Sequence, residues 1–232
     1  MDQNYANTVR MATAEPYTAR VQALIVLCHP YERSFCRALA DALNEGIAAA
    51  GIPVAGGRSA AANGPPAGDG PAAVFHDLYA EHPDPVLTGA EIARRFSMDE
   101  QIQRYSEEVT RADRLWFVHP DWWSGPPALL KGWLDRVFRP GIAYEWQGED
   151  FTEKRHVPLL EAKELAVFVT TDRDQDDPPL PIEGFWRDVA GYSGMRMPRY
   201  TLYPNLRRSG HRQRRMWLQD AREYARGCQS HG

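Results

Sequence analysis

The sequence lacks the features that mark membrane and secreted proteins. No apolar run approaches the roughly 20 residues that cross a bilayer, and residues 1–20 contain no apolar stretch that would serve as a signal peptide. The chain has three cysteines, Cys28, Cys36 and Cys228, without any C-x-x-C spacing. A disulfide framework is therefore not expected, and these absences predict a cytoplasmic protein without membrane insertion.

Positive charge is also not in excess. The formal net charge is −4, whereas proteins that bind nucleic acid non-specifically need many cations to displace counterions from phosphates. Nucleic acid is therefore not expected as a partner. The seven histidines include no pair at i,i+3 or i,i+4, and no cysteine lies at ligand spacing, so we expect no metal site.

The motifs of several enzyme classes are missing as well. The chain has no G-x-G-x-x-G and no P-loop, which argues against a Rossmann dinucleotide site and against nucleotide hydrolysis. A G-x-S-x-G nucleophile elbow is absent too. Any cofactor site must therefore be built from other loops.

The 232 residues suffice for one domain with a sizeable core. We interpret residues 1–20 as a flexible N-terminal arm, because they are polar and lack periodicity. Residues 21–232 then form a single domain. A Gly/Ala/Pro-rich stretch at 55–72 interrupts this domain as a surface insertion, because strand signals resume directly after it.

Strand and helix signals alternate along this domain. Short apolar runs rich in Val, Ile, Leu and Phe predict five buried strands, at 21–29, 73–79, 115–120, 165–172 and 197–203. Five helices are predicted between and after them, from the N-cap Ser34 to the stop at Gly51, at 98–112, at 126–138, at 182–191 and at 209–227. This order predicts an α/β fold, namely a doubly wound five-stranded parallel sheet of order 2-1-3-4-5 with helices on both faces. Ligands in such sheets bind beyond the carboxyl ends of the strands.

The first loop at that rim carries His29, Arg33, Ser34 and Phe35. It opens a helix, where unpaired N–H groups and the positive end of the helix dipole favour an anion. A phosphate site and an ordinary N-cap with a surface turn are equally compatible with these residues.

The second loop is HPDWWSGPP, residues 119–127, and its candidates for a ligand site are Pro120, Asp121, Trp122, Trp123 and Ser124. Adjacent loop residues point in different directions, so a flat ring system can lie against one of the two indoles. The alternative is that one tryptophan caps the core and the other covers a subunit interface.

The third loop begins with Thr170, Thr171, Asp172 and Arg173. Its hydroxyls would donate to a ligand, and the Arg173 guanidinium would lie near an atom that gains negative charge. The alternative is a solvated acidic surface loop, which fits Asp174, Asp176 and Asp177 at least as well.

Two motifs carry a resemblance to a known family. The segments H-P-x-x-x-S-F and P-x-W-W-S-G-P-P-A-L-L-K-G-W-L-D-R-V-F resemble the NAD(P)H:quinone oxidoreductases related to DT-diaphorase, which have a flavodoxin-like fold. The similarity extends over roughly residues 22–203. It implies a noncovalent flavin, FMN or FAD, with NAD(P)H as electron donor, and a homodimer with its active site at the subunit interface.

Carried onto this sequence, the resemblance assigns His29, Ser34 and Phe35 to the phosphate or pyrophosphate of the flavin. The segment 120–123 would flank the isoalloxazine ring, and Thr170 and Thr171 its pyrimidine side. Trp123 and Arg173 are our candidates for the catalytic residues. The expected activity is two-electron hydride transfer from NAD(P)H to a quinone or a similar flat aromatic acceptor.

The chain also departs from the family pattern. The family commonly has Thr-Thr-Gly-Gly in the third loop, but here Thr171 is followed by Asp172 and Arg173, and Asp121 stands where an apolar residue is common. Two alternatives therefore stay open, a flavin-binding ancillary subunit with little turnover and a tailoring reductase for one aromatic substrate. The basic run from Arg207 to Arg215 is a solvated helix face or a contact for an adenosine phosphate.

Overall fold

The computed structural model describes residues 21–56, 72–148, 154–174, 177 and 181–227. The predicted N-terminal arm, most of the predicted insertion and Cys228 lie outside these residues. The ends of the predicted insertion do not belong to it, because Ala55 and Gly56 lie in strand β2 and Ala72 begins strand β3.

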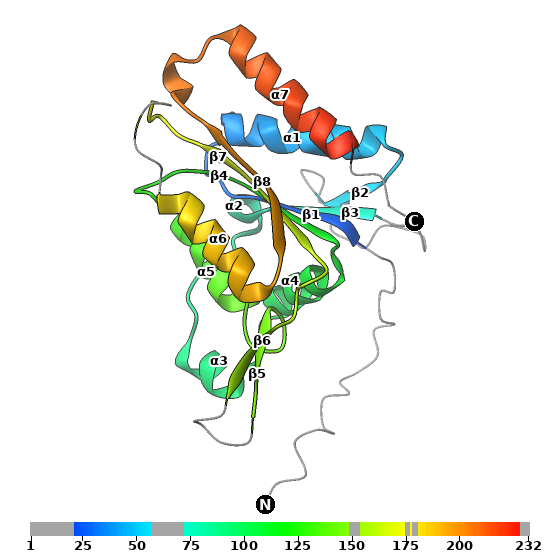
Figure 1. Cartoon of the computed structure of the whole chain (residues 1–232), viewed down its shortest axis with the longest axis vertical. Coiled ribbons are helices and arrows are strands. Elements are labelled where there is room, and N and C mark those ends of the chain that lie inside the picture. The colour runs from blue at the N-terminus through cyan, green and yellow to red at the C-terminus, as the bar shows by residue number, and fades with distance from the viewer. Residues whose placement is uncertain (1–20, 57–71, 149–153, 175–176, 178–180, 228–232) are drawn as a thin grey trace, which may run out of the picture.

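The described chain forms a doubly wound α/β sandwich (Figure 1). Its central sheet has the order β2-β3-β1-β4-β7-β8, and all neighbouring strands in it are parallel. The strands are β2 (Val54–Gly56), β3 (Ala72–Asp77), β1 (Val21–Leu27), β4 (Arg114–Pro120), β7 (Glu164–Thr170) and β8 (Arg196–Tyr203). The five predicted strands thus pair in the predicted order 2-1-3-4-5. The prediction of five strands missed β2, a three-residue strand at the edge.

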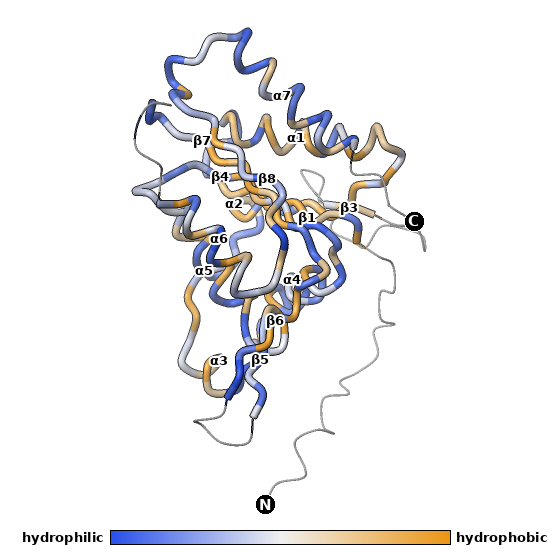
Figure 2. Tube along the Cα trace, viewed as in Figure 1, coloured by the Kyte–Doolittle hydropathy of each residue, from blue (hydrophilic) through white to orange (hydrophobic). Residues whose placement is uncertain are grey.

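Helices cover both faces of the sheet. In Figure 1, α1 (Phe35–Ala49) and α7 (His211–Arg226) lie on one face, and α4 (Glu100–Arg111), α5 (Ala128–Val137) and α6 (Pro181–Ser193) on the other. Each strand therefore divides its side chains between two cores. Leu24 and Val26 of β1 pack toward α4 and α5, whereas Ile25 and Leu27 pack toward α1 and α7. Figure 2 shows the resulting apolar centre between more polar outer helix faces.

Helix α1 begins as the sequence predicts. The Oγ of Ser34 accepts a hydrogen bond from the N–H of Arg37 at 3.1 Å, and Gly51 has a φ of +83° just beyond the end of the helix. Gly46 brings α1 against α7, because a Cβ at this position would lie 2.3 Å from the carbonyl oxygen of Arg222. The contact fixes the C-terminal part of α7 against α1.

Some elements were not predicted. A two-stranded antiparallel ribbon, β5 (Tyr144–Gln147) with β6 (Arg155–Pro158), and two short helices, α2 (Leu78–Glu81) and α3 (Gly89–Arg94), lie between the main elements. The predicted strand 73–79 ends at Asp77, because the carboxylate of Asp77 caps the N–H groups of Tyr79 and Ala80 and begins α2. No helix among the described residues is long and apolar enough to cross a membrane.

The segment 82–99 is held against α5 by Arg136. Its guanidinium donates to Glu91 Oε1 at 2.7 Å and to the carbonyl oxygen of Asp84 at 2.8 Å, and it lies 3.2 Å from Asp99. Gly132 makes the close packing possible, because a Cβ there would meet the backbone of Pro85. Arg136 therefore stabilises the fold within this chain.

Candidate active site

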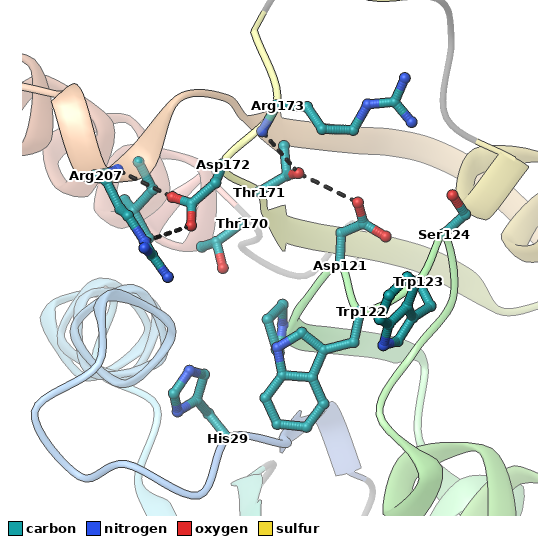
Figure 3. Close-up of a pocket in the computed structure, with 12 residues that line it drawn as sticks. His29, Asp121, Trp122, Trp123, Ser124, Thr170, Thr171, Asp172, Arg173 and Arg207 are labelled. Carbon is teal, nitrogen blue, oxygen red and sulfur yellow. Dashed lines mark hydrogen bonds and ion pairs between the residues drawn. The ribbon is translucent and has the colours of Figure 1, made fainter.

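A cavity of about 630 Å³ opens at the carboxyl rim of the sheet (Figure 3). Most of its lining comes from the three loops that follow β1, β4 and β7. The lining residues are His29, Pro120, Asp121, Trp122, Trp123, Ser124, Thr170, Thr171, Asp172, Arg173, Leu206 and Arg207. Ten of these twelve were candidates from the sequence. They meet because the carboxyl ends of parallel strands share one edge of the sheet.

The Trp loop, residues 122–125, is a tight hairpin turn. The N–H of Trp122 donates to the carbonyl oxygen of Gly125 at 3.0 Å, and the reverse bond measures 3.2 Å. Trp123 and Ser124 both have positive φ, +57° and +61°, as the two central residues of a type I′ turn do. Non-glycine residues pay a conformational penalty there, which the paired hydrogen bonds offset.

This turn directs the two indoles in different directions (Figure 3). Trp122 is 40% exposed, and its ring centroid lies 6.1 Å from that of His29 across the cavity. Trp123 is fully exposed. Neither indole caps the core, so this part of the alternative derived from the sequence is wrong. Both remain available to a ligand or to another chain.

A buried histidine fixes the base of the Trp loop. His119 is fully buried, and its Nδ1 lies 2.8 Å from the carbonyl oxygen of Pro120, to which it donates. Its Nε2 accepts a hydrogen bond from the indole N–H of Trp186 at 3.0 Å. Burial lowers the pKa of His119 to about 4, so the ring is neutral at pH 7. Sequence reasoning missed this role, because His119 was considered only as a metal ligand.

The hydroxyl groups of the Thr loop, residues 170–173, form hydrogen bonds within the protein. Oγ1 of Thr170 shares a hydrogen bond with Sγ of the buried Cys36 at 3.2 Å. Thr171 donates its hydroxyl proton to Oδ2 of Asp121 at 3.2 Å and accepts from the N–H of Arg173 at 3.2 Å. The Thr171 hydroxyl is thus not a free donor to a ligand, contrary to the expectation from the sequence.

Backbone N–H groups of the Thr loop are also engaged. The N–H of Thr171 donates to the carbonyl oxygen of Tyr203 at 3.0 Å, and that of Arg173 donates to Thr171. Among the described residues, the N–H of Asp172 has no such acceptor. It is therefore the one backbone donor of residues 171–173 that this arrangement leaves for a ligand.

Asp172 ties this loop to the segment after β8. Its Oδ2 lies 2.8 Å from Nε of Arg207, and its Oδ1 accepts from the N–H of Arg207 at 3.1 Å (Figure 3). The N–H of Leu206 adds a bond to the carbonyl oxygen of Thr171 at 3.0 Å. Where the family commonly has Gly-Gly, this chain thus closes one cavity wall with an ion pair. Leu206 and Arg207 were not among the candidates, although Arg207 opens the basic run noted in the sequence.

The candidates of the first loop other than His29 lie beside the cavity and not in its lining. Arg33 is exposed, Ser34 caps α1, and the ring of Phe35 packs against Tyr203 and Trp217, 6.0 and 5.8 Å away. None of the three lines the cavity, and their proposed contact with a phosphate stays a prediction. Arg173 does line it, and its Nε lies 3.4 Å from Asp177.

Comparison with known proteins agrees with this architecture. Residues 60–226 match the family described as flavodoxin-like fold, which is more than half of the chain. The protein belongs to this family. Within this family, the chain is similar to NAD(P)H oxidoreductases, as the sequence motifs predicted.

Two relatives illustrate the similarity in sequence. An uncharacterized NAD(P)H oxidoreductase of Haemophilus influenzae is 31% identical over 156 residues, which cover 66% of this chain and 65% of that protein. NAD(P)H dehydrogenase [quinone] 1 of Cavia porcellus is 30% identical over 144 residues, 54% of this chain and 46% of that protein. The chain thus spans about two thirds or less of the length of these relatives.

Solved structures show the same fold. The NAD(P)H:quinone oxidoreductase from Methanothermobacter marburgensis superposes with a TM-score of 0.66 at 24% identity, covering 92% of this chain and all of that one. An FMN-dependent NADH-azoreductase from Bacillus anthracis in complex with FMN gives a TM-score of 0.64 at 12% identity, covering 88% and 97%. At these identities the likeness concerns the fold.

Proposed function

We propose that this protein is a flavin-dependent NAD(P)H oxidoreductase that passes two electrons to a quinone or a similar flat aromatic acceptor. The observation that carries the proposal is the cavity at the carboxyl rim, walled by indoles on one side and by polar loop groups on the other. The names of the relatives, NAD(P)H oxidoreductase and NAD(P)H dehydrogenase [quinone], support the same class of reaction.

The residues present fit a flavin, FMN or FAD. The cavity volume of about 630 Å³ falls in the range of small-molecule sites, and the exposed face of Trp122 offers a flat apolar wall. Pro120, Asp121, Trp123 and Ser124 would flank the ring system from the same loop. Thr170, Thr171, Asp172 and Arg173 would face its polar edge, with the free N–H of Asp172 as a donor.

A phosphate would lie at the start of α1. The first N–H groups of a helix are unpaired, and the positive end of the helix dipole favours an anion. His29, Arg33, Ser34 and the N–H of Phe35 are the groups that would hold it. Burial lowers the pKa of His29, so its ring would contribute a neutral donor rather than a charge.

A bound flavin supplies the hydride chemistry, accepting from NAD(P)H and donating to the acceptor. The chain orients the reactants between its walls, and such positioning can lower a barrier by roughly 7–11 kcal/mol in ideal cases. Trp123 would stack with the donor or acceptor. The guanidinium of Arg173 would stabilise negative charge that develops at the polar edge of the cavity.

The protein is further proposed to act as a cytoplasmic homodimer. The fully exposed Trp123 at the mouth of the cavity supports a second subunit there, because large exposed apolar side chains mark contact sites when they gather at a pocket. Sedimentation analysis of the purified protein tests this point separately from the activity.

The purified protein provides the direct test. We expect the visible spectrum of a bound flavin, release of FMN or FAD identified by mass spectrometry, and NAD(P)H oxidation that depends on an acceptor. A panel of quinones, azo dyes and nitroaromatics distinguishes a general quinone reductase from a tailoring reductase. Flavin binding without turnover would favour an ancillary subunit, and failure to bind FMN or FAD would end the proposal.

A further inference from the structure

Asp121 holds a carboxylate at the cavity wall that has few hydrogen-bond donors. Its Oδ2 accepts from the hydroxyl of Thr171 at 3.2 Å, and its Oδ1 is buried and has no partner among the described residues (Figure 3). A carboxylate has about four acceptor positions, and buried polar atoms are nearly always paired. The charge of Asp121 is therefore poorly offset by hydrogen bonds, although it lines the cavity.

The other charged side chains that line the cavity each have an ionic partner. Asp172 lies 2.8 Å from Arg207, and Arg173 lies 3.4 Å from Asp177. All four of these side chains are at least 39% exposed, so solvent screens their charges further. Asp121 is half-buried and forms no ion pair among the described residues. It is thus the one charge in the described cavity lining that no cation offsets by pairing.

The backbone fixes the position of this carboxylate. Asp121 directly follows β4, and its N–H donates to the carbonyl oxygen of Thr170 at the end of β7, at 2.7 Å. The neighbouring Thr171, whose hydroxyl binds the carboxylate, is held in turn by its own N–H, which donates to Tyr203 of β8 at 3.0 Å. The negative charge therefore belongs to the rigid rim of the sheet.

We propose that the carboxylate of Asp121 makes the cavity bind a reduced flavin less tightly than an oxidised one, and so lowers the reduction potential of the bound cofactor. The inference rests on the proposed function. A hydride brings two electrons and one proton, so its acceptor gains one unit of negative charge unless a second proton follows. The unpaired carboxylate repels that charge, because charges in a partly buried site are screened less than in water.

This repulsion divides the free energy of the reaction between its two halves. A lower potential makes electron transfer from NAD(P)H to the cofactor less favourable, and it makes transfer from the cofactor to the acceptor more favourable by the same amount. The overall free energy is unchanged, since no net charge is left on the protein after a turnover. Asp121 acts through its charge alone, and no proton or electron passes through it.

The test compares Asp121→Asn and Asp121→Leu with the wild type, each loaded with the flavin that the wild type binds. Both substitutions remove the charge, but asparagine keeps the size and an acceptor for Thr171, whereas leucine removes all hydrogen bonding. Titration against a reference dye measures the reduction potential of the bound flavin, and fluorescence measures the dissociation constant of the oxidised form. Together these two values give the dissociation constant of the reduced form.

We expect both variants to bind reduced flavin, relative to oxidised flavin, roughly tenfold more tightly than the wild type does, the order of the repulsion between unit charges across a small cavity. For a two-electron couple, a tenfold change raises the reduction potential by about 30 mV. Asp188→Asn is the matched control, because it removes the same charge from an exposed position on α6 outside the cavity lining. It should leave the potential unchanged.

An unchanged potential in the Asp121 variants, or an equal rise in Asp188→Asn, would overturn the inference. A rise in only one of the two Asp121 variants would also overturn it, because a lost charge acts in both. If neither Asp121 variant binds oxidised flavin, the side chain is needed for binding itself and the inference fails.

None of these results would affect the flavoenzyme proposal. If the wild type binds neither FMN nor FAD, the proposed function fails, and the inference fails with it. The flavin titration of the wild type distinguishes the two kinds of failure.

Discussion

The indole N–H of Trp186 donates to Nε2 of His119 at 3.0 Å and so fixes the tautomer of a fully buried imidazole. The other ring nitrogen then has to carry the proton that it donates to the carbonyl oxygen of Pro120. Helix α6 thereby positions the backbone that leads into the Trp loop.

This arrangement predicts acid sensitivity. The folded pKa of His119 is about 4, against an ordinary value of 6.5, so below pH 6.5 the unfolded chain binds a proton that the folded chain excludes. The stabilisation is complete above pH 6.5 and falls by up to about 3 kcal/mol as the pH drops through 4. Urea unfolding of wild type and His119→Gln from pH 7 to 4 measures it. The exposed His211→Gln is the control, and parallel curves for wild type and H119Q would contradict the prediction.

For His76 we predict the opposite pH dependence, namely stability that falls as the pH rises. Burial alone would lower its pKa, but Glu108 at 2.6 Å and Glu81 at 2.9 Å outweigh burial and raise it to about 9. Its contribution is complete below pH 6.5 and is lost as the pH rises through 9, with a size of the order of 1–3 kcal/mol. Glu108→Gln should flatten the stability curve between pH 7 and 9. An unchanged slope in E108Q would show that another group titrates there.

Gly46→Ala tests the close contact between α1 and α7. Alanine has the higher helix propensity by about 1 kcal/mol, but a Cβ at position 46 would lie 2.3 Å from the carbonyl oxygen of Arg222. We expect a net loss of about 1–3 kcal/mol in the free energy of unfolding. Gly191→Ala in α6 meets nothing within 4 Å and should be neutral or stabilising. Similar effects of the two substitutions would mean that the helices are packed less closely.

Trp123→Gly separates the effect of the exposed indole on stability from its effect on activity. Glycine adopts positive φ without penalty, and the indole is fully exposed, so stability should stay unchanged or rise by about 0.5–1 kcal/mol. If the indole stacks with a donor or acceptor, the KM for one of these substrates should increase about tenfold. Thermal unfolding and steady-state kinetics on the same preparation measure both effects. Unchanged kinetics would remove Trp123 from the proposed site.

Arg207→Ala tests the ion pair that closes one cavity wall. Exposed ion pairs contribute only about 0–1 kcal/mol, so the free energy of unfolding should change little. Flavin affinity should nevertheless fall several-fold, because Asp172 loses the partner that holds it. Arg222→Ala, which breaks the exposed pair with Glu45 away from the cavity, should leave flavin affinity unchanged. Flavin fluorescence titration of both variants measures these affinities.

Much of the fold follows from local patterns in the sequence. The alternation of buried strands with helices gave the order of five strands, and that order placed His29, Trp122 and Thr170 at one rim because parallel strands end together. The N-cap Ser34 was equally local, since it depends on one side chain and the next helical turn. These features need no knowledge of distant contacts.

What the sequence did not predict depends on contacts between distant segments. Strand β2 has only three residues and is held by pairing with β3. Arg207 reaches the cavity only because β8 pairs with β7, and the hydroxyl of Thr171 is committed to Asp121, 50 residues away. The tautomer of His119 likewise depends on Trp186, 67 residues further along the chain.

The ion pair between Asp172 and Arg207 also has a consequence for the order of events during synthesis. The cavity is complete only after the last strand has paired and its following turn has reached the rim, so a nascent chain that ends before residue 207 cannot present a finished binding surface. A ligand of this cavity therefore binds the finished domain in preference to any shorter intermediate. By mass action such a ligand would stabilise the completely folded domain and not the intermediates that precede it.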